Sequence, residues 1–177
     1  MASELHVDAI KHSGGTSALT IDSSGNLTAS ANVHYAGAVV QVARTYNANS
    51  SHISTSSTSL VASGIQCSLT PKFSNSLILV DFSTSMMHSN AGDKIFAKMY
   101  LKIGSASIAA MPSAGLYQLA YTSGLQYQST VFSGSYTATS TDTLMFEPYF
   151  ENGTQAVAVY LVHSSASYGL TVMEIKQ

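Results

Sequence analysis

Six histidines, one cysteine and two closely spaced glutamates are the side chains of this chain that most often carry chemistry in proteins. The histidines are scattered along the sequence: His6, His12, His34, His52, His88 and His163. No two have the i, i+4 spacing of a helical metal site, and no His-x-His pair could hold a metal on a strand. A threefold axis could gather three copies of His34. Exposed or hydrogen-bonded histidines explain the pattern better, so neither a metal site nor a cofactor is predicted.

Nucleophilic and acid–base sites are not indicated by the sequence either. Cys67 lies in a strand-like apolar stretch, where a buried packing role is expected. No serine stands in a G-x-S-x-G elbow, and no glycine-rich phosphate loop is present. Glu147 and Glu151 could be the carboxylate pair of a glycosidase, but their spacing around Pro148 is typical of a strand end and loop. We predict that the chain is not an enzyme; an enzyme with a degenerate site is the alternative.

Composition and charge exclude several classes of partner. The 177 residues carry a formal net charge of −2, and only 9% of them are charged, against about a quarter in an average soluble domain. The cations do not cluster, so nucleic-acid binding is not predicted. Membrane binding is not predicted, because the sequence has neither an apolar span nor a basic amphipathic helix. The first residues lack the features of a signal peptide. The single cysteine fits synthesis in a reducing cytoplasm. So little surface charge favours an oligomer.

Apolar residues with a period of two predict an all-β fold. Ser76–Ser83 contains four consecutive aliphatic residues and is typical of a strand covered on both faces, by a second sheet or another subunit. Lys94–Ile103 alternates and predicts a half-buried antiparallel strand. Further strands are predicted over Ala38–Thr45, Leu60–Leu69, Leu116–Tyr121, Leu125–Phe132, Thr143–Phe150, Gln155–His163 and Leu170–Ile175. Pro148 implies an edge strand or a bulge. The pattern predicts an antiparallel β-sandwich that is jelly-roll-like.

Residues 1–37 are predicted to form a β-hairpin arm and connector, followed by a sandwich knob over residues 38–177. Gly14-Gly15 and Ser23–Asn26 predict two turns between three short strands. Asp22–Asn26 also resembles half of a calcium loop, but no downstream glutamate follows and a plain turn is predicted. So thin a hairpin has little core of its own. Its apolar side chains are therefore expected to bind a partner: Leu5, Val7, Ile10, Leu19, Ile21 and Leu27. A floppy tail is the alternative, and alternating Leu and Ile argue against it.

Tyrosines are frequent on the strands predicted near the middle of the knob. Tyr117, Tyr121, Tyr127 and Tyr136 could together present a glycan-binding surface, because aromatic faces stack on sugars. Tyrosine is also common in β-sheets in general, and packing in the core or at an interface is the favoured interpretation.

Five stretches carry a resemblance to a known group of proteins: MASELHVDAI, ALTIDSSGNLT, VVQV, STSSTSLVASGIQCSLTPKFSNSLILV and GLTVMEI. Together they resemble small virion structural proteins of tailed phages that infect cyanobacteria and other aquatic bacteria. The resemblance implies a trimeric β-rich knob, of a capsid decoration protein or a tail-fibre-like protein, and carries no catalytic motif. The glycine-rich linker that often precedes VVQV in that group is reduced here to HYAGA.

The short arm favours one of these two roles. A fibre that reaches for a receptor needs a long shaft, and 37 residues are too few for one. We therefore expect a homotrimeric capsid cement protein, made in the host cytoplasm, that stands on the outer surface of the capsid and clamps the major capsid protein with its arm. The alternative is a tail-fibre or head-fibre knob that contacts tail components and binds a host-surface glycan through the loops around His88–Asp93 or Thr122–Gly124.

Overall fold

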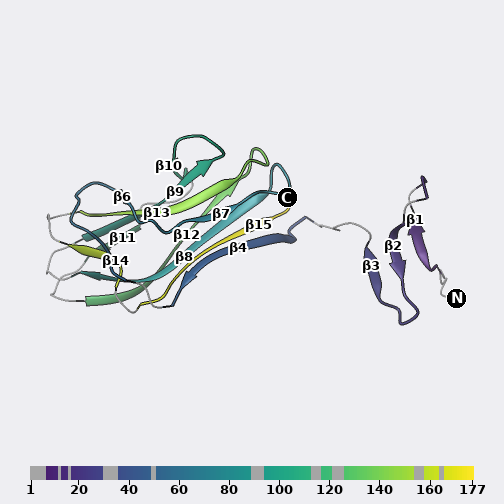
Figure 1. Cartoon of the computed structure of the whole chain (residues 1–177), viewed down its shortest axis with the longest axis horizontal. Helices are drawn as coiled ribbons and strands as arrows, with labels where there is room; N and C mark the ends of the chain where they lie inside the picture. The colour runs from purple at the N-terminus through teal and green to yellow at the C-terminus, as the bar shows by residue number, and fades with distance from the viewer. Residues whose placement is uncertain are drawn as a thin grey trace. The chain divides into compact units, whose positions relative to one another are not determined.

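The computed structural model describes residues 7–11, 13–15, 17–29, 36–48, 51–88, 94–112, 117–120, 126–153, 158–163 and 166–177. Contacts between Cα atoms divide the chain into two compact units, Met1–Tyr35 and Ala36–Gln177, hereafter the arm and the knob. All elements of the described residues are β-strands, and every pairing between them is antiparallel (Figure 1). The predicted all-β class is confirmed.

The strands run through both units in sequence order. They are β1 (Ala9–Lys11), β2 (Ser17–Ile21), β3 (Leu27–Ala29), β4 (Val39–Asn47), β5 (Ile53–Thr55), β6 (Val61–Ala62), β7 (Cys67–Leu69), β8 (Leu77–His88), β9 (Lys94–Ile103), β10 (Ala109–Ala110), β11 (Tyr117–Ala120), β12 (Gln126–Thr137), β13 (Leu144–Asn152), β14 (Val159–Val162) and β15 (Tyr168–Ile175). Within the ranges given above, no helix has the length and apolarity that a membrane crossing requires.

The arm is one three-stranded sheet in the order β1-β2-β3. Its second turn is built around Asp22, whose carboxylate accepts hydrogen bonds from the main-chain N–H of Ser24 (2.9 Å) and of Asn26 (2.8 Å) and from the Asn26 side-chain amide (2.9 Å). These bonds, above all the one from the Asn26 side chain, lower the pKa of Asp22. Gly25, at φ +83°, supplies the left-handed backbone that the turn requires. The carboxylate is thus used as in a plain turn, and the predicted order of strands and turns is confirmed.

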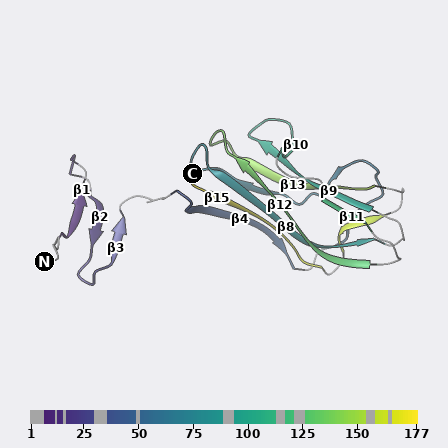
Figure 2. The ribbon, with the colours of Figure 1, turned by 180° about the vertical axis from the view of Figure 1, so that it is seen from behind.

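The knob is a sandwich of two six-stranded antiparallel sheets (Figures 1 and 2). In the first, named the β8 sheet, the order is β4-β15-β8-β14-β5, and β12 pairs with β8 along its whole length. Since β15 and β14 both pair with β8 as well, they must share its other edge. In the second, named the β9 sheet, the order is β10-β9-β13-β6, with β11 also on β9 and β7 also on β13. The predicted antiparallel sandwich is confirmed.

The core fills the space between the two sheets. It is made of the inward-pointing residues of each strand, and β8 and β9 supply its centre with Ile78, Val80, Phe82, Ile95, Ala97 and Met99. The Phe82 ring packs edge-to-face on Phe132 of the neighbouring strand, with ring centroids 5.2 Å apart. Ile95, Ala97 and Met99 point inward as the alternation over Lys94–Ile103 predicts, because successive side chains of a strand point to opposite faces.

The strand at Ser76–Ser83 has one face in the core and one face outside. Ile78, Val80 and Phe82 are fully buried, whereas Leu77 and Leu79 lie on the outer face and are half-buried. No described residue of the knob forms a layer over that outer face. Within the knob, the prediction that both faces are covered therefore holds for the inner face alone.

The prediction that Pro148 lies in an edge strand or at a bulge is wrong. Its strand, β13, is central: it pairs without a bulge with β9 on one side and with β7 and β6 on the other. β7 pairs with residues 144–146 and β6 with residues 149–150, so Pro148 lies between the two short neighbours. A proline lacks only the N–H, and the gap between β7 and β6 removes the need for one.

Two buried glutamates fix loops to the sheets. Glu147 on β13 accepts hydrogen bonds from the Gly64 N–H (2.8 Å) and the Gln66 side chain (3.0 Å). Glu174 on β15 accepts one from the Ser76 hydroxyl (2.7 Å), one from the Gln41 side chain (2.7 Å), and bonds from the N–H groups of residues 72 and 73. Burial by itself raises the pKa of Glu174, but these hydrogen bonds outweigh it, and the pKa lies below its ordinary value.

Candidate functional site

The arm carries one aliphatic face. The register pairs Ile10 on β1 with Leu19 on β2, and Ile21 lies two residues further along β2, so the three side chains share one face of the sheet. Ile10 is 51% exposed, and Leu19 and Ile21 are half-buried. The opposite face carries the exposed pair Thr20 and Thr28. The described residues of the arm form this single sheet, which provides no second layer for the aliphatic face.

The other predicted arm residues are placed less fully. Val7 is half-buried and precedes β1. The backbone of Leu27 pairs with Ile21, but its side chain and the whole of Leu5 lie outside the described part of the chain. Three of the six predicted contact residues thus lie on one face, and their role in binding a partner stays a prediction.

The outer face of the β8 sheet carries a second aliphatic surface, named the apolar patch. Its six side chains form two rows across β4, β15 and β8, with Val42, Met173 and Leu79 in one row and Val39, Ile175 and Leu77 in the next. Val39 and Val42 are 55% and 56% exposed, and the other four are half-buried. A contiguous aliphatic surface of this kind is typical of a protein–protein contact.

Two of the residues that could do chemistry, Cys67 and Glu147, are used in packing and in holding a loop. Cys67 is buried in the core, as predicted, and burial raises the pKa of its thiol. Glu147 and Glu151 lie on the same face of β13, about 13 Å apart along the strand, and Glu147 holds the turn at Gly64. In the part of the chain that the structure describes, no three His, Cys, Asp or Glu side chains form a group that could hold a metal ion.

The described tyrosines considered for a glycan-binding surface do not gather on one face, and two of the three pack against the core, in line with the favoured interpretation. Tyr117 is half-buried, with its ring stacked on Phe132 at 5.7 Å between centroids. Tyr136 packs against the core. Tyr127 is 54% exposed and points to the outer face, and Tyr121 lies outside the described residues.

Tyr127 belongs instead to a group of rings that the sequence analysis did not bring together, named the aromatic cluster. His163 packs edge-to-face on Tyr127 and on His52, with ring centroids 4.8 Å apart in both pairs. Tyr160 completes the cluster at 4.9 Å from His52. The rings come from β12, β14 and the segments beside β5 and β14, and no local spacing in the sequence indicates that these segments meet.

Comparisons with known proteins leave the family of this chain undetermined. No family model and no curated protein match it. Among solved structures, it is similar to the CBM22-1 xylan-binding domain of Paenibacillus barcinonensis Xyn10C, at 11% identity and a TM-score of 0.38, over 82% of this chain and 99% of that one. It is also similar to the PRD1 vertex protein P5, at 14% identity and a TM-score of 0.37, over 79% of this chain and 100% of that one. Such low similarity supports no statement about function.

Proposed function

We propose that this protein is a non-catalytic structural component of a phage virion, a homotrimeric cement protein on the outer surface of the capsid. The observation that carries the proposal is that each unit presents an aliphatic surface that no described residue of the same unit covers: the face with Ile10, Leu19 and Ile21 on the arm, and the apolar patch on the knob. The sequence resemblance to small phage virion proteins supplies the setting.

The arm is the proposed contact with the major capsid protein. A three-stranded sheet without a second layer gains stability when its apolar face packs on another surface. Burying one Ile or Leu side chain contributes about 1.5–3 kcal/mol, so a single arm would bind weakly. Three arms on one trimer would bind with avidity, because the second and third contacts form at a high effective concentration.

The apolar patch is the proposed contact between knobs. Its six aliphatic side chains, together with a chain in which only 9% of residues are charged, favour association over a free monomer in water. A compact trimer would present its three arms to the shell from one body. The knob would then need no active site, since its function is mechanical.

The arm contact is tested with a full-length variant that keeps strand propensity but loses the aliphatic face: Ile10→Thr, Leu19→Thr and Ile21→Thr. We expect sedimentation with capsids prepared without this protein to be lost, while the knob stays folded and oligomeric. The matched control, Thr20→Gln with Thr28→Gln, changes the opposite face and should sediment as wild type. Normal sedimentation of the threonine variant would refute the arm contact.

The location is tested by cryo-electron microscopy of the intact virion. Knobs distributed over the icosahedral shell would support the cement role. Density confined to the tail would refute it and favour the alternative, a fibre knob that binds a host-surface glycan. The loop residues first considered for that role, 89–93 and 122–124, lie outside the described residues, but the aromatic cluster is an observation in its favour.

A further inference from the structure

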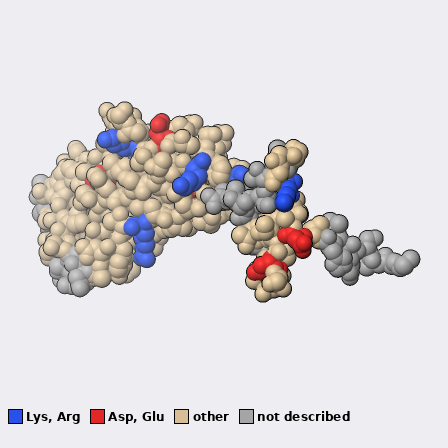
Figure 3. All heavy atoms as spheres, turned by 45° about the vertical axis from the view of Figure 1, so that its right-hand side comes forward, with Lys and Arg blue, Asp and Glu red and all other residues tan. Residues whose placement is uncertain are grey.

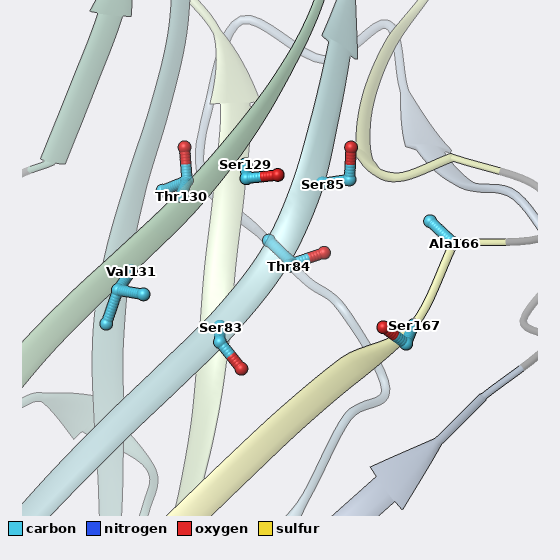
Figure 4. Close-up of a pocket in the computed structure, with 8 residues that line it drawn as sticks. All are labelled: Ser83, Thr84, Ser85, Ser129, Thr130, Val131, Ala166 and Ser167. Carbon is cyan, nitrogen blue, oxygen red and sulfur yellow. The ribbon is translucent and has the colours of Figure 1, made fainter.

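An open groove of about 510 Å³ lies on the outer face of the β8 sheet, between β12 and the segment that leads into β15 (Figure 4). It forms where β8 changes neighbours. β15 pairs with β8 as far as Ser83, and β14 pairs with it from Met87. Between them, the His163 N–H donates to the Ser85 carbonyl (3.2 Å), and the groove lies beside Ser85, with Ala166 and Ser167 along its border.

Six of the eight residues that line the groove are serine or threonine, and none of the eight is charged. Two threonines are buried and already bonded: Thr84 Oγ1 donates to a main-chain carbonyl of β14 (3.0 Å), and Thr130 Oγ1 shares a hydrogen bond with the Tyr117 hydroxyl (3.2 Å). Ser85 and Ser129 are direct partners on adjacent strands and point to the outer face. A serine hydroxyl both donates and accepts, which suits a ligand that is itself rich in hydroxyls.

The aromatic cluster adjoins this groove. Tyr127 and Ser129 lie on the same face of β12, about 7 Å apart along the strand. Tyr127 is 54% exposed, and His163 packs edge-to-face against it at 4.8 Å between ring centroids. A supported ring that stays accessible to solvent offers a flat apolar surface beside the hydroxyls, the combination with which proteins fix both the position and the orientation of a ligand.

We propose that the groove and the aromatic cluster together bind a neutral oligosaccharide. One sugar ring stacks on Tyr127, and the hydroxyls of the next ring bond to Ser85 and Ser129. From Tyr127 to Val131 this face of β12 extends about 13 Å, which suits a short oligosaccharide. The groove lining holds no cation for a phosphate or sulfate group. The inference does not depend on the proposed capsid role, because the groove lies on a single knob and shares no residue with the apolar patch.

The experiment is a printed array of neutral and anionic oligosaccharides, followed by titration calorimetry with cellohexaose, mannohexaose and chitohexaose. We expect binding to neutral oligosaccharides. Tyr127→Ala should weaken it about tenfold, the upper range of an aromatic stacking contact, and Tyr127→Phe should restore it. Ser129→Leu, which replaces a hydroxyl with an aliphatic group that fills the groove, should abolish binding.

Tyr46→Ala is the matched control. Tyr46 is on the same face of the same sheet and is 55% exposed, against 54% for Tyr127, but it lies on β4, outside the groove. The Tyr46→Ala variant should bind sugars as the wild-type protein does. The inference is overturned if no neutral oligosaccharide binds, if only anionic ones bind, or if Tyr127→Ala binds as wild type. It is also overturned if Tyr127→Ala and Ser129→Leu reduce capsid binding and leave sugar binding intact, because the groove would then be a protein contact.

Discussion

The two sheets of the knob share one strand geometry but differ in what they present outward. The outer face of the β9 sheet carries charges and aromatic rings: Lys94, Lys98, Lys102, Glu147, Glu151, Tyr100 and Tyr149. On the outer face of the β8 sheet, the rows of β4, β15, β8 and β12 contain two charged residues, Arg44 and Asp81. Those rows are otherwise aliphatic near one end and rich in serine around the groove.

Three side chains on the outer face of the β9 sheet have partners within the knob. Tyr100 and Tyr149 are cross-strand neighbours whose rings stack with centroids 3.9 Å apart, and Glu147 is bonded to the turn at Gly64. On the side of the molecule drawn in Figure 3, charged side chains of the knob stand singly among uncharged ones. The difference teaches that period-two alternation decides which residues point outward, whereas the identity of those residues indicates which face is suited to contacts with other molecules.

The largest expected effect is on association of the knob. Val42→Asp with Leu79→Asp places two charges in the apolar patch, and we expect the proposed oligomer to dissociate to monomer, with the association constant lowered about a hundredfold or more. Size-exclusion chromatography with light scattering measures this. Ala62→Asp with Ser68→Asp, at exposed outer positions of the β9 sheet, is the control and should leave the oligomer unchanged. An oligomer that survives the patch variant would show that the two faces do not differ in this way.

The next largest expected effect is on the free energy of unfolding, and it compares the buried carboxylate of Glu174 with the surface carboxylate of Glu151. Glu174→Gln keeps the shape of the side chain but weakens hydrogen bonds to the loop around residues 72–76, and we expect the free energy of unfolding to fall by about 1–3 kcal/mol. Glu151→Gln, on the outer face of the β9 sheet, should change it by less than about 0.5 kcal/mol. Urea unfolding of both variants decides the matter, and equal losses would contradict the anchoring role of Glu174.

Acid should act through the same carboxylate. The pKa of Glu174 in the folded protein lies below its ordinary value of 4.5, so the unfolded chain takes up the proton first as the pH falls. Its contribution to stability is complete above about pH 5–6 and is lost progressively as the pH falls from there through the lowered folded pKa. Thermal unfolding from pH 7 to pH 3 should show a smaller loss of stability for Glu174→Gln than for wild type. Parallel curves for the two proteins would assign acid sensitivity to other groups.

The smallest effect is expected on the β9 face itself. Tyr100→Ala removes the ring that stacks on Tyr149. The loss of this ring contact should lower the free energy of unfolding by about 0.5–1.5 kcal/mol, counted apart from the loss of buried area. Oligomer size and sugar binding should stay at the wild-type level, because neither proposed contact includes this face. A change in the oligomer would extend the contact surface to the β9 sheet.

The sequence by itself determined the local features of this protein. Alternation of apolar and polar residues predicted the strands and their inward residues, such as those of β9, since a strand side chain needs only its own neighbours to alternate. Glycines and Asp22 marked the turns of the arm, and the apolar surroundings of Cys67 predicted its burial. These are properties of a few consecutive residues.

Only the tertiary structure decided which strands are neighbours. The apolar patch joins residues 39–42, 77–79 and 173–175, and the aromatic cluster joins His52, Tyr127 and His163. Pro148 lies in a central strand because two short strands leave a gap beside it. A period of two leaves the partner and the register of a strand open, and long-range pairing fixes both. A sequence pattern therefore could not predict the surfaces that several strands form together.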